Sequence, residues 1–383
     1  MKWVGSLGIS VICLGLAWAQ APVPQGTHTQ GPRAVGSFDR ISKEADSARQ
    51  AGRIDDAIAL YKRGVALRPS WEEGWWFLGS LYYDQDNYEA GRDAFRRLTA
   101  INSQVGLTWA MLGLCEYNLR QYEPALAHLG HGISLGLSDS QEIADVARYH
   151  VALLLVRSGE FELALKELTE FSRRGLDQPK YVEAVGLAAL RKPLLPEELP
   201  PSDRALVLEA GRAMFDAMAR RVKDAESDFR LLLDRFPNTP NIHYLYGSFL
   251  LNEDAERALA EMKKELEVSP NHVPALVAIA AELLRGQEYR GALPYAEKAV
   301  ETDVNSFAAH AILGRALVEG DIDKLRGVKE LETARTLQPL SPQVRLALGT
   351  AYAKVGRNAD AARERQIAQT MRKTDAGAPE GKR

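Results

Sequence analysis

Apolar and small residues recur along most of the chain with the three- and four-residue spacing of amphipathic helices, and this pattern is itself repeated. Its clearest copy, residues 72–105, contains the sequence Trp-x2-Leu-Gly-x2-Tyr, which begins at Trp75 and is followed by Phe95. Weaker copies follow about every 34 residues. Residues three and four apart lie on one face of a helix, so each copy predicts two short helices separated by a turn.

The other copies keep the same kinds of small and large residue. Small residues let two helices approach closely, and a proline ends the second helix because it lacks the next backbone donor. One such match is weak evidence, but eight or nine in phase are strong. The residues that define the copies are Ala45, Ala48, Ala57, Tyr61 and Pro69; Trp109, Leu112, Gly113 and Ala125; Val151, Ala152, Leu155, Ala164 and Leu168; Ala225, Phe229 and Pro237; Tyr246, Gly247, Ala258 and Pro270; Ala280, Ala292 and Ala299; Leu313, Gly314 and Pro339; and Leu348, Gly349, Tyr352 and Ala361.

The motif at Trp75 and its spacing resemble the tetratricopeptide repeat, a helix–turn–helix unit of 34 residues. The resemblance covers about residues 38–372, although the first copy lacks the aromatic residue and the glycine. It implies an all-α superhelical solenoid of about nine to ten repeats, interrupted by a proline-rich linker. Such solenoids present an extended concave surface for binding other molecules.

The composition along the chain predicts six segments. Residues 192–202 contain four prolines and two glutamates, which favours a stiff connector over a helix. The predicted segments are a signal peptide at 1–19, a flexible leader at 20–36, an N-terminal repeat block at 37–191, the linker at 192–203, a C-terminal repeat block at 204–372 and a disordered tail at 373–383.

The first nineteen residues have the features of a secretory signal peptide. Lys2 precedes an apolar run, and small residues at Ala17 and Ala19 suit cleavage after Ala19. The alternative is an uncleaved membrane anchor, because the run is only slightly too short for a span. After cleavage Cys115 is the single cysteine, so no internal disulfide can form. The sequence therefore predicts an exported protein, periplasmic or secreted, with no integral membrane span after cleavage.

Charge and motifs argue against several classes of function. The net charge is −3, with both signs interleaved, so no basic stripe suggests nucleic-acid binding. We find no His-Glu-x2-His, Gly-x-Ser-x-Gly or phosphate-loop sequence. His128 and His131 share one helix face, but without a third ligand an exposed pair is the favoured interpretation. The sequence predicts no catalytic residue, no metal and no cofactor.

In the repeat family that the chain resembles, the first helix of each hairpin lines the concave groove. We expect groove residues one step round that helix from the packing positions. The N-terminal candidates are largely aromatic, and the C-terminal ones are more basic. The predicted groove residues are Trp76, Ser80, Tyr83, Leu114, Tyr117, Asn118, Tyr149, Arg157, Tyr244, Asn252, Arg285 and Arg315.

These features predict an exported, non-enzymatic scaffold that binds another protein or a peptide segment in its groove. Tyrosine and tryptophan offer large contact areas with few rotors to freeze, which suits peptide recognition. The alternative is a recruiting or regulatory subunit of a cell-envelope enzyme, such as a glycosyltransferase or a peptidase. The sequence does not identify the partner or the oligomeric state.

Overall fold

A computed structural model describes residues 32–137, 140–251 and 253–377. These residues form α-helices, short 3-10 turns and loops, and contain no strand. The predicted signal peptide, Asn252 and the last six residues lie outside the described residues. Among the helices described, none has both the length and the apolar composition needed to cross a membrane.

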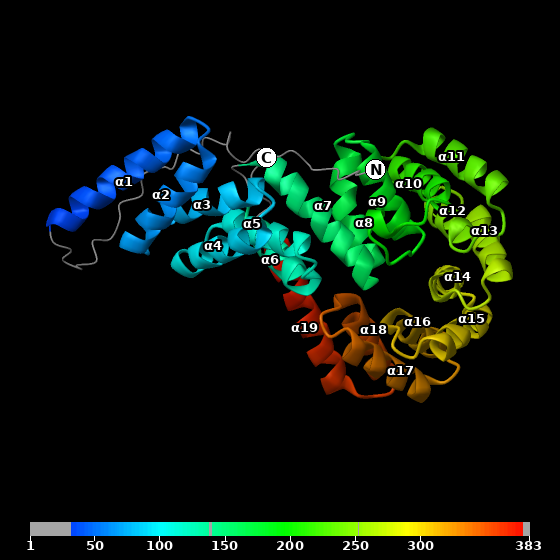
Figure 1. The fold of residues 1–383 in the computed structure, drawn as a ribbon. Coiled ribbons are helices and arrows are strands. Elements are labelled where there is room, and N and C mark those ends of the chain that lie inside the picture. Colours follow the sequence, from blue (N-terminus) through cyan, green and yellow to red (C-terminus); the bar gives the residue numbers. More distant parts are fainter. Residues whose placement is uncertain (1–31, 138–139, 252, 378–383) are drawn as a thin grey trace. The chain divides into compact units, whose positions relative to one another are not determined.

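The chain divides into two compact units, which we call unit 1 (to Asp203) and unit 2 (from Arg204). Each unit is a succession of short helices (Figure 1). The helices of unit 1 are α1 (Pro32–Gln50), α2 (Ile54–Leu67), α3 (Glu72–Asp84), α4 (Tyr88–Ile101), α5 (Gly106–Asn118), α6 (Tyr122–Leu135), α7 (Gln141–Ser158), α8 (Phe161–Arg173) and α9 (Pro179–Ala189), followed by the 3-10 turn η2 (Pro196–Glu198). Those of unit 2 are α10 (Arg204–Met218), α11 (Val222–Arg235), α12 (Ile242–Leu250), α13 (Ala255–Val268), α14 (Val273–Arg285), α15 (Tyr289–Thr302), α16 (Phe307–Glu319), α17 (Lys324–Leu337), α18 (Pro342–Lys354) and α19 (Asn358–Gly377).

Consecutive helices pair into hairpins, four in unit 1 and five in unit 2, and α9 has no second helix. The first helix of one hairpin contacts the first helix of the next. For example, α5 contacts α7, and α16 contacts α18. Second helices contact mainly their own partner and the following first helix. The first helices therefore form the inner layer of each unit. The predicted all-α helix–turn–helix solenoid of nine to ten repeats is confirmed.

A residue in the left-handed conformation recurs in the turn inside the hairpins. Gly52, Asp86 and Arg120 have φ of 69°, 57° and 58°, at intervals of 34 residues. Arg191, directly after α9, has φ of 53°. So α9 ends as the first helix of a repeat, but the prolines that follow prevent a second helix.

The residues after α9 form a strap instead of a helix, and we use this name for residues 192–203. Leu195 and Leu199 are buried, and only the single turn η2 lies between them. An ion pair of 2.8 Å from Lys192 Nζ to Asp203 Oδ2 joins the two ends of the strap. The strap belongs to unit 1, and its role as a stiff connector between two repeat blocks stays a prediction.

Close helix contacts occur at the small residues that the repeat pattern predicted. A Cβ atom at Gly79 would lie 2.9 Å from the ring of the fully buried Phe95. At Gly314 it would lie 2.8 Å from the carbonyl oxygen of Gly327. Glycine is needed at these positions because the second helix occupies the space of a side chain. The same holds at Gly113, Gly247 and Gly349.

Of the two adjacent tryptophans of α3, the one predicted for the groove is the more deeply buried, while Trp75 packs against the core from a half-buried position. Trp76, expected in the groove, is 4 % exposed and packs edge to face on Phe95 at 5.6 Å between ring centroids. Trp75, expected in the core, is half-buried and donates its indole N–H to the carbonyl of Pro69 at 2.9 Å. The reason is that α3 lies between two other hairpin helices, so neighbouring positions on it face different partners.

Candidate polypeptide-binding grooves

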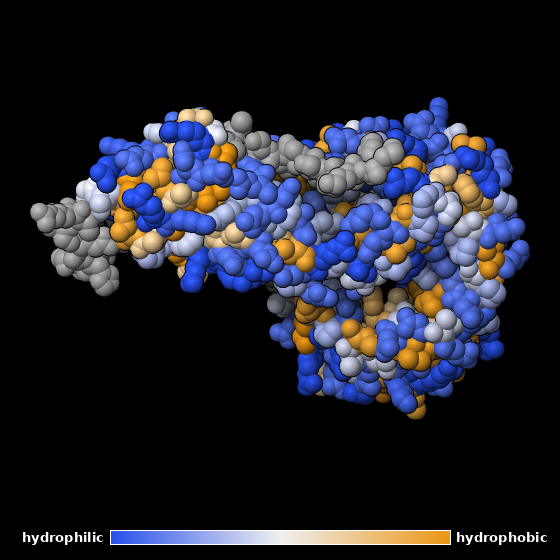
Figure 2. All heavy atoms as spheres, viewed as in Figure 1, coloured by the Kyte–Doolittle hydropathy of each residue, from blue (hydrophilic) through white to orange (hydrophobic). Residues whose placement is uncertain are grey.

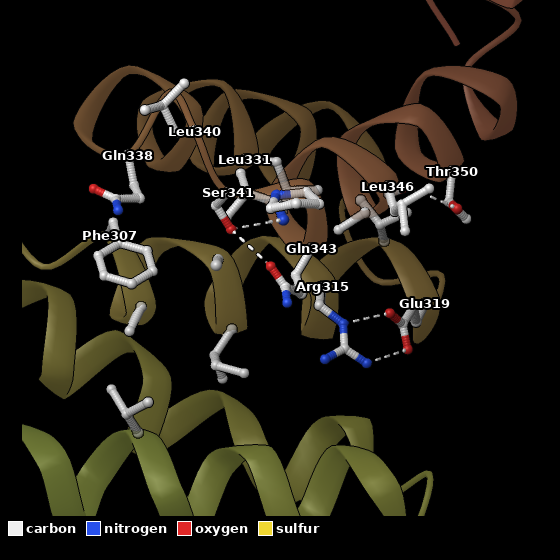
Figure 3. A pocket seen from close by; sticks show the side chains of 18 of the residues that line it. Phe307, Arg315, Glu319, Leu331, Gln338, Leu340, Ser341, Gln343, Leu346 and Thr350 are labelled. Atoms are coloured by element: carbon white, nitrogen blue, oxygen red, sulfur yellow. Dashed lines mark hydrogen bonds and ion pairs between the residues drawn. The ribbon is translucent and has the colours of Figure 1, made fainter. Parts of the chain in front are cut away.

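Unit 2 contains a groove of about 840 Å³ on the layer of first helices. It lies between α16 and α18, with Val277 of α14 also lining it. Figure 3 shows the side chains of both helices directed toward the space between them. The groove residues include Phe307, Ala308, Ala311, Ile312, Arg315, Glu319, Leu340, Gln343, Leu346, Ala347 and Thr350.

The walls of this groove are mainly apolar and partly open to solvent. Phe307 is 41 % exposed and Leu340 is 76 % exposed, although both are large hydrophobic side chains. Polar groups lie at its edge, where Ser341 hydrogen-bonds to Gln343 at 3.3 Å. In the view of Figure 2, hydrophobic residues are visible among polar ones over the C-terminal helices. Such a surface suits an apolar segment whose ends remain hydrated.

The predicted groove residues of unit 2 do not form the basic groove that the sequence suggested. Arg315 lines the groove, but it pairs with Glu319 of the same helix at 2.8 Å. Arg285 is exposed and pairs with Glu282 at 2.9 Å. Tyr244 is half-buried, and its backbone N–H donates to Glu265. Asn252 lies outside the described residues. The positive charges on the first helices are therefore largely neutralised by neighbouring carboxylates.

In unit 1 several predicted residues reach solvent. Asn118 is exposed and Tyr83, Tyr117 and Arg157 are half-buried. Burial raises the pKa of Tyr83 to about 12, and a hydrogen bond with Asn118 partly opposes this shift. The tyrosine hydroxyl therefore remains a neutral donor and acceptor near pH 7. These side chains come from α3, α5 and α7, the first helices of three successive hairpins.

Four other predicted groove residues are buried. Trp76, Ser80, Leu114 and Tyr149 are between 2 % and 7 % exposed. They offer little area to a ligand in this structure, because neighbouring helices cover them. For the Ser80 hydroxyl no partner is found among the described residues. We therefore restrict the contact surface of unit 1 to Tyr83, Tyr117, Asn118 and Arg157.

The histidines on α6 form aromatic and polar contacts. His128 Nδ1 lies 2.6 Å from Glu116 Oε2, and the ring centroids of His128 and His131 lie 5.2 and 4.9 Å from that of Trp109. Within the described part of the chain, no group of three or more potential ligands is arranged for a metal. Cys115 is buried, and burial raises its pKa, so the thiol is not activated as a nucleophile.

His150 makes the stability of unit 1 depend on pH. Its ring is buried in α7, where Nδ1 donates to the carbonyl of Val146 at 2.8 Å. Burial lowers the pKa of His150 to about 4, and the charge of Lys180 adds to the effect. In the unfolded chain the histidine has a pKa of about 6.5. Between about pH 6.5 and pH 4 the unfolded chain therefore binds a proton at His150 that the folded chain does not bind. Stability is lost as the pH falls below about 6.5.

We expect unit 1 to lose about 2 kcal/mol of stability from this residue between pH 7 and pH 5. Urea unfolding followed by tryptophan fluorescence measures the loss, because every tryptophan after residue 18 lies between 71 and 109. A His150→Phe variant should show a correspondingly weaker dependence on pH. A His131→Gln variant, altered at an exposed histidine, is the control and should behave as the parent. Equal slopes in all three proteins would refute this role of His150.

Comparison with known proteins agrees with the fold. A family model described as "Tetratricopeptide repeat" matches residues 42–105, which cover most of the first two hairpins. With the stacked hairpins, this match supports a tetratricopeptide-repeat protein. No curated protein sequence matches the chain.

Several solved structures of MamA are similar to part of the chain. MamA 41-end from Desulfovibrio magneticus RS-1 is 24 % identical, with a TM-score of 0.40 over 44 % of this chain and 96 % of that chain. A MamA RS-1 ArsTM double mutant is 23 % identical, with a TM-score of 0.40 and the same coverage. Another MamA crystal structure is 14 % identical, with a TM-score of 0.38 over 43 % and 96 % of the two chains. We draw no functional conclusion from these likenesses.

Proposed function

We propose that the chain is an exported, non-catalytic scaffold that binds a segment of another polypeptide on the inner layer of its helical hairpins. The observation that carries this proposal is the open apolar groove of about 840 Å³ between α16 and α18. Phe307 and Leu340 stand exposed there, and such side chains gain free energy when a partner removes them from water. A helix or an extended segment with apolar side chains would fit this surface.

The proposal includes export, which rests on the sequence of residues 1–19. It also includes the absence of catalysis, which rests on the lack of a recognised catalytic motif in the sequence. An exported chain with one cysteine after cleavage has no internal disulfide, so packing and other noncovalent contacts must stabilise it. The glycine and alanine contacts between hairpin helices supply that packing.

A double variant, Phe307→Ser with Leu340→Ser, tests the groove. Leu340 is 76 % exposed and Phe307 is 41 % exposed, so we expect the fold to be retained while partner binding weakens roughly tenfold or more. Affinity capture from an envelope extract, with quantitative mass spectrometry, measures the loss of specific partners.

The matched control is Leu325→Ser. Leu325 is 76 % exposed, like Leu340, but lies on the second helix α17 and does not line the groove. The control should capture the same partners as the parent chain. If the groove variant also captures them all undiminished, with an unchanged melting curve, this groove is not the binding site.

A further inference from the structure

The strap of residues 192–203 contacts the predicted groove of unit 1 through an acidic side chain. Glu198 accepts two hydrogen bonds from Arg157 Nη1, at 2.7 Å to Oε1 and 2.5 Å to Oε2. It also accepts the backbone N–H of Leu195 at 2.9 Å, which fixes the carboxylate within the turn. Arg157 lies near the end of α7, 41 residues earlier in the chain. The strap therefore returns to a helix of the preceding hairpin.

Arg157 is held over an aromatic surface. Its guanidinium carbon lies 4.7 Å from the ring centroid of Tyr122. The Tyr122 ring is 5.9 Å from that of Tyr117, edge to face, and Tyr117 packs in the same way on His150 at 4.5 Å. A planar guanidinium stacked on an aromatic ring remains free to bind a carboxylate with its edge. In this structure the carboxylate that Arg157 binds is that of Glu198.

The negative charges of the strap also act on the tyrosines of unit 1. After burial, the negative charge of Glu197 is the largest influence that raises the pKa of Tyr117, and Glu198 acts in the same direction. The charge of Glu197 also raises the pKa of Tyr149. The direct contact between the strap and a predicted groove residue is the one from Glu198 to Arg157. Leu195 and Leu199, on either side, are buried and hold the acidic turn in place.

We propose that the strap is a built-in occupant of the groove of unit 1, and that the partner segment which displaces it is acidic, with glutamates or aspartates flanked by leucines. This inference rests on the proposed function and names the chemistry of the partner at unit 1. The strap itself, Leu-Pro-Glu-Glu-Leu from Leu195 to Leu199, is the pattern for such a segment. Arg157 then exchanges one carboxylate for another, so the same charge-assisted hydrogen bonds form in both states.

Displacement is feasible because the charged contact is only partly shielded. The Arg157 and Glu198 side chains are 36 % and 35 % exposed. Solvent screens an ion pair that is exposed to this extent, so it contributes little free energy to holding the strap in place. A tethered occupant nevertheless competes effectively, since its local concentration is that of an intramolecular ligand. The intact chain should therefore bind a free acidic peptide more weakly than a chain whose strap has lost its charge.

The first experiment measures binding of a fluorescein-labelled Leu-Pro-Glu-Glu-Leu-Pro-Pro peptide to the full chain by fluorescence anisotropy. A double variant, Glu197→Gln with Glu198→Gln, should bind this peptide about fivefold more tightly than the parent chain, because Arg157 is released. The peptide with glutamine in place of both glutamates is the control and should bind more weakly to both proteins. Equal binding of the two peptides, or no gain in the variant, would overturn the proposal.

A charge exchange provides an independent test. The double variant Arg157→Glu with Glu198→Arg keeps an ion pair between strap and groove but reverses its direction. We expect it to lose affinity for the acidic peptide and to bind the corresponding Leu-Pro-Arg-Arg-Leu peptide instead. Retained preference for the acidic peptide would show that recognition does not involve Arg157.

These outcomes are separable from failure of the proposed function. The peptide experiments alter only unit 1, to which the strap belongs, whereas the capture experiment alters Phe307 and Leu340 in unit 2. Loss of partners in the unit 2 variant, with no peptide effect at Arg157, would reject the strap inference alone. A peptide effect at Arg157 without any change in capture would reject the unit 2 groove and retain the strap inference.

Discussion

Gly132→Ala should destabilise unit 1 by about 1–3 kcal/mol, although it adds one methyl group. A Cβ atom at Gly132 would lie 2.7 Å from Gly106 O, 2.9 Å from Ala110 N and 3.4 Å from Ala110 Cα. All three atoms belong to the backbone of α5, so no side chain can rotate away. The whole helix must move, and closely packed interiors resist such shifts. Urea unfolding followed by tryptophan fluorescence gives the change in stability.

The control is Gly130→Ala, two residues away in the same helix. Nothing lies within 4 Å of a Cβ atom at Gly130. Alanine is favoured over glycine in a helix interior by roughly 0.5–1 kcal/mol, so this variant should be more stable than the parent. The two substitutions are chemically identical and should have opposite signs. A similar effect at both positions would show that α5 and α6 are not in close contact.

Glu364→Ala should destabilise the end of unit 2 by about 3–5 kcal/mol. The Glu364 carboxylate is buried and binds two guanidinium groups, Arg335 at 2.6 Å and Arg345 at 2.8 Å. It thereby joins α17, α18 and α19. Without the carboxylate, two positive charges face each other in a partly buried site. Hydrogen exchange of α17–α19, read by mass spectrometry, and thermal unfolding by circular dichroism measure the loss.

Glu297→Ala is the matched comparison for this prediction. Glu297 also pairs with an arginine 29 residues away, Arg326 at 2.7 Å, but the two side chains are 38 % and 45 % exposed. Solvent screens such a pair, so its removal should cost at most about 1 kcal/mol. If Glu364→Ala costs no more than this, the buried carboxylate does not organise the three helices.

The repeat pattern by itself determined the helix–turn–helix solenoid. Each hairpin packs mainly on its neighbours, so the spacing of residues such as Gly79, Phe95 and Ala125 carries nearly all the information that the fold requires. Local rules also located the break after α9, because prolines cannot continue a helix.

The surface that a ligand meets was decided only by the tertiary structure. Which of Trp75 and Trp76 is buried depends on how two neighbouring hairpins enclose α3, and helical spacing does not contain that information. The pairing of Arg157 with Glu198 spans 41 residues and requires the strap to fold back on α7. A periodic sequence specifies contacts between adjacent repeats because they recur. Contacts made once, by a segment outside the period, depend on the path of the chain in space.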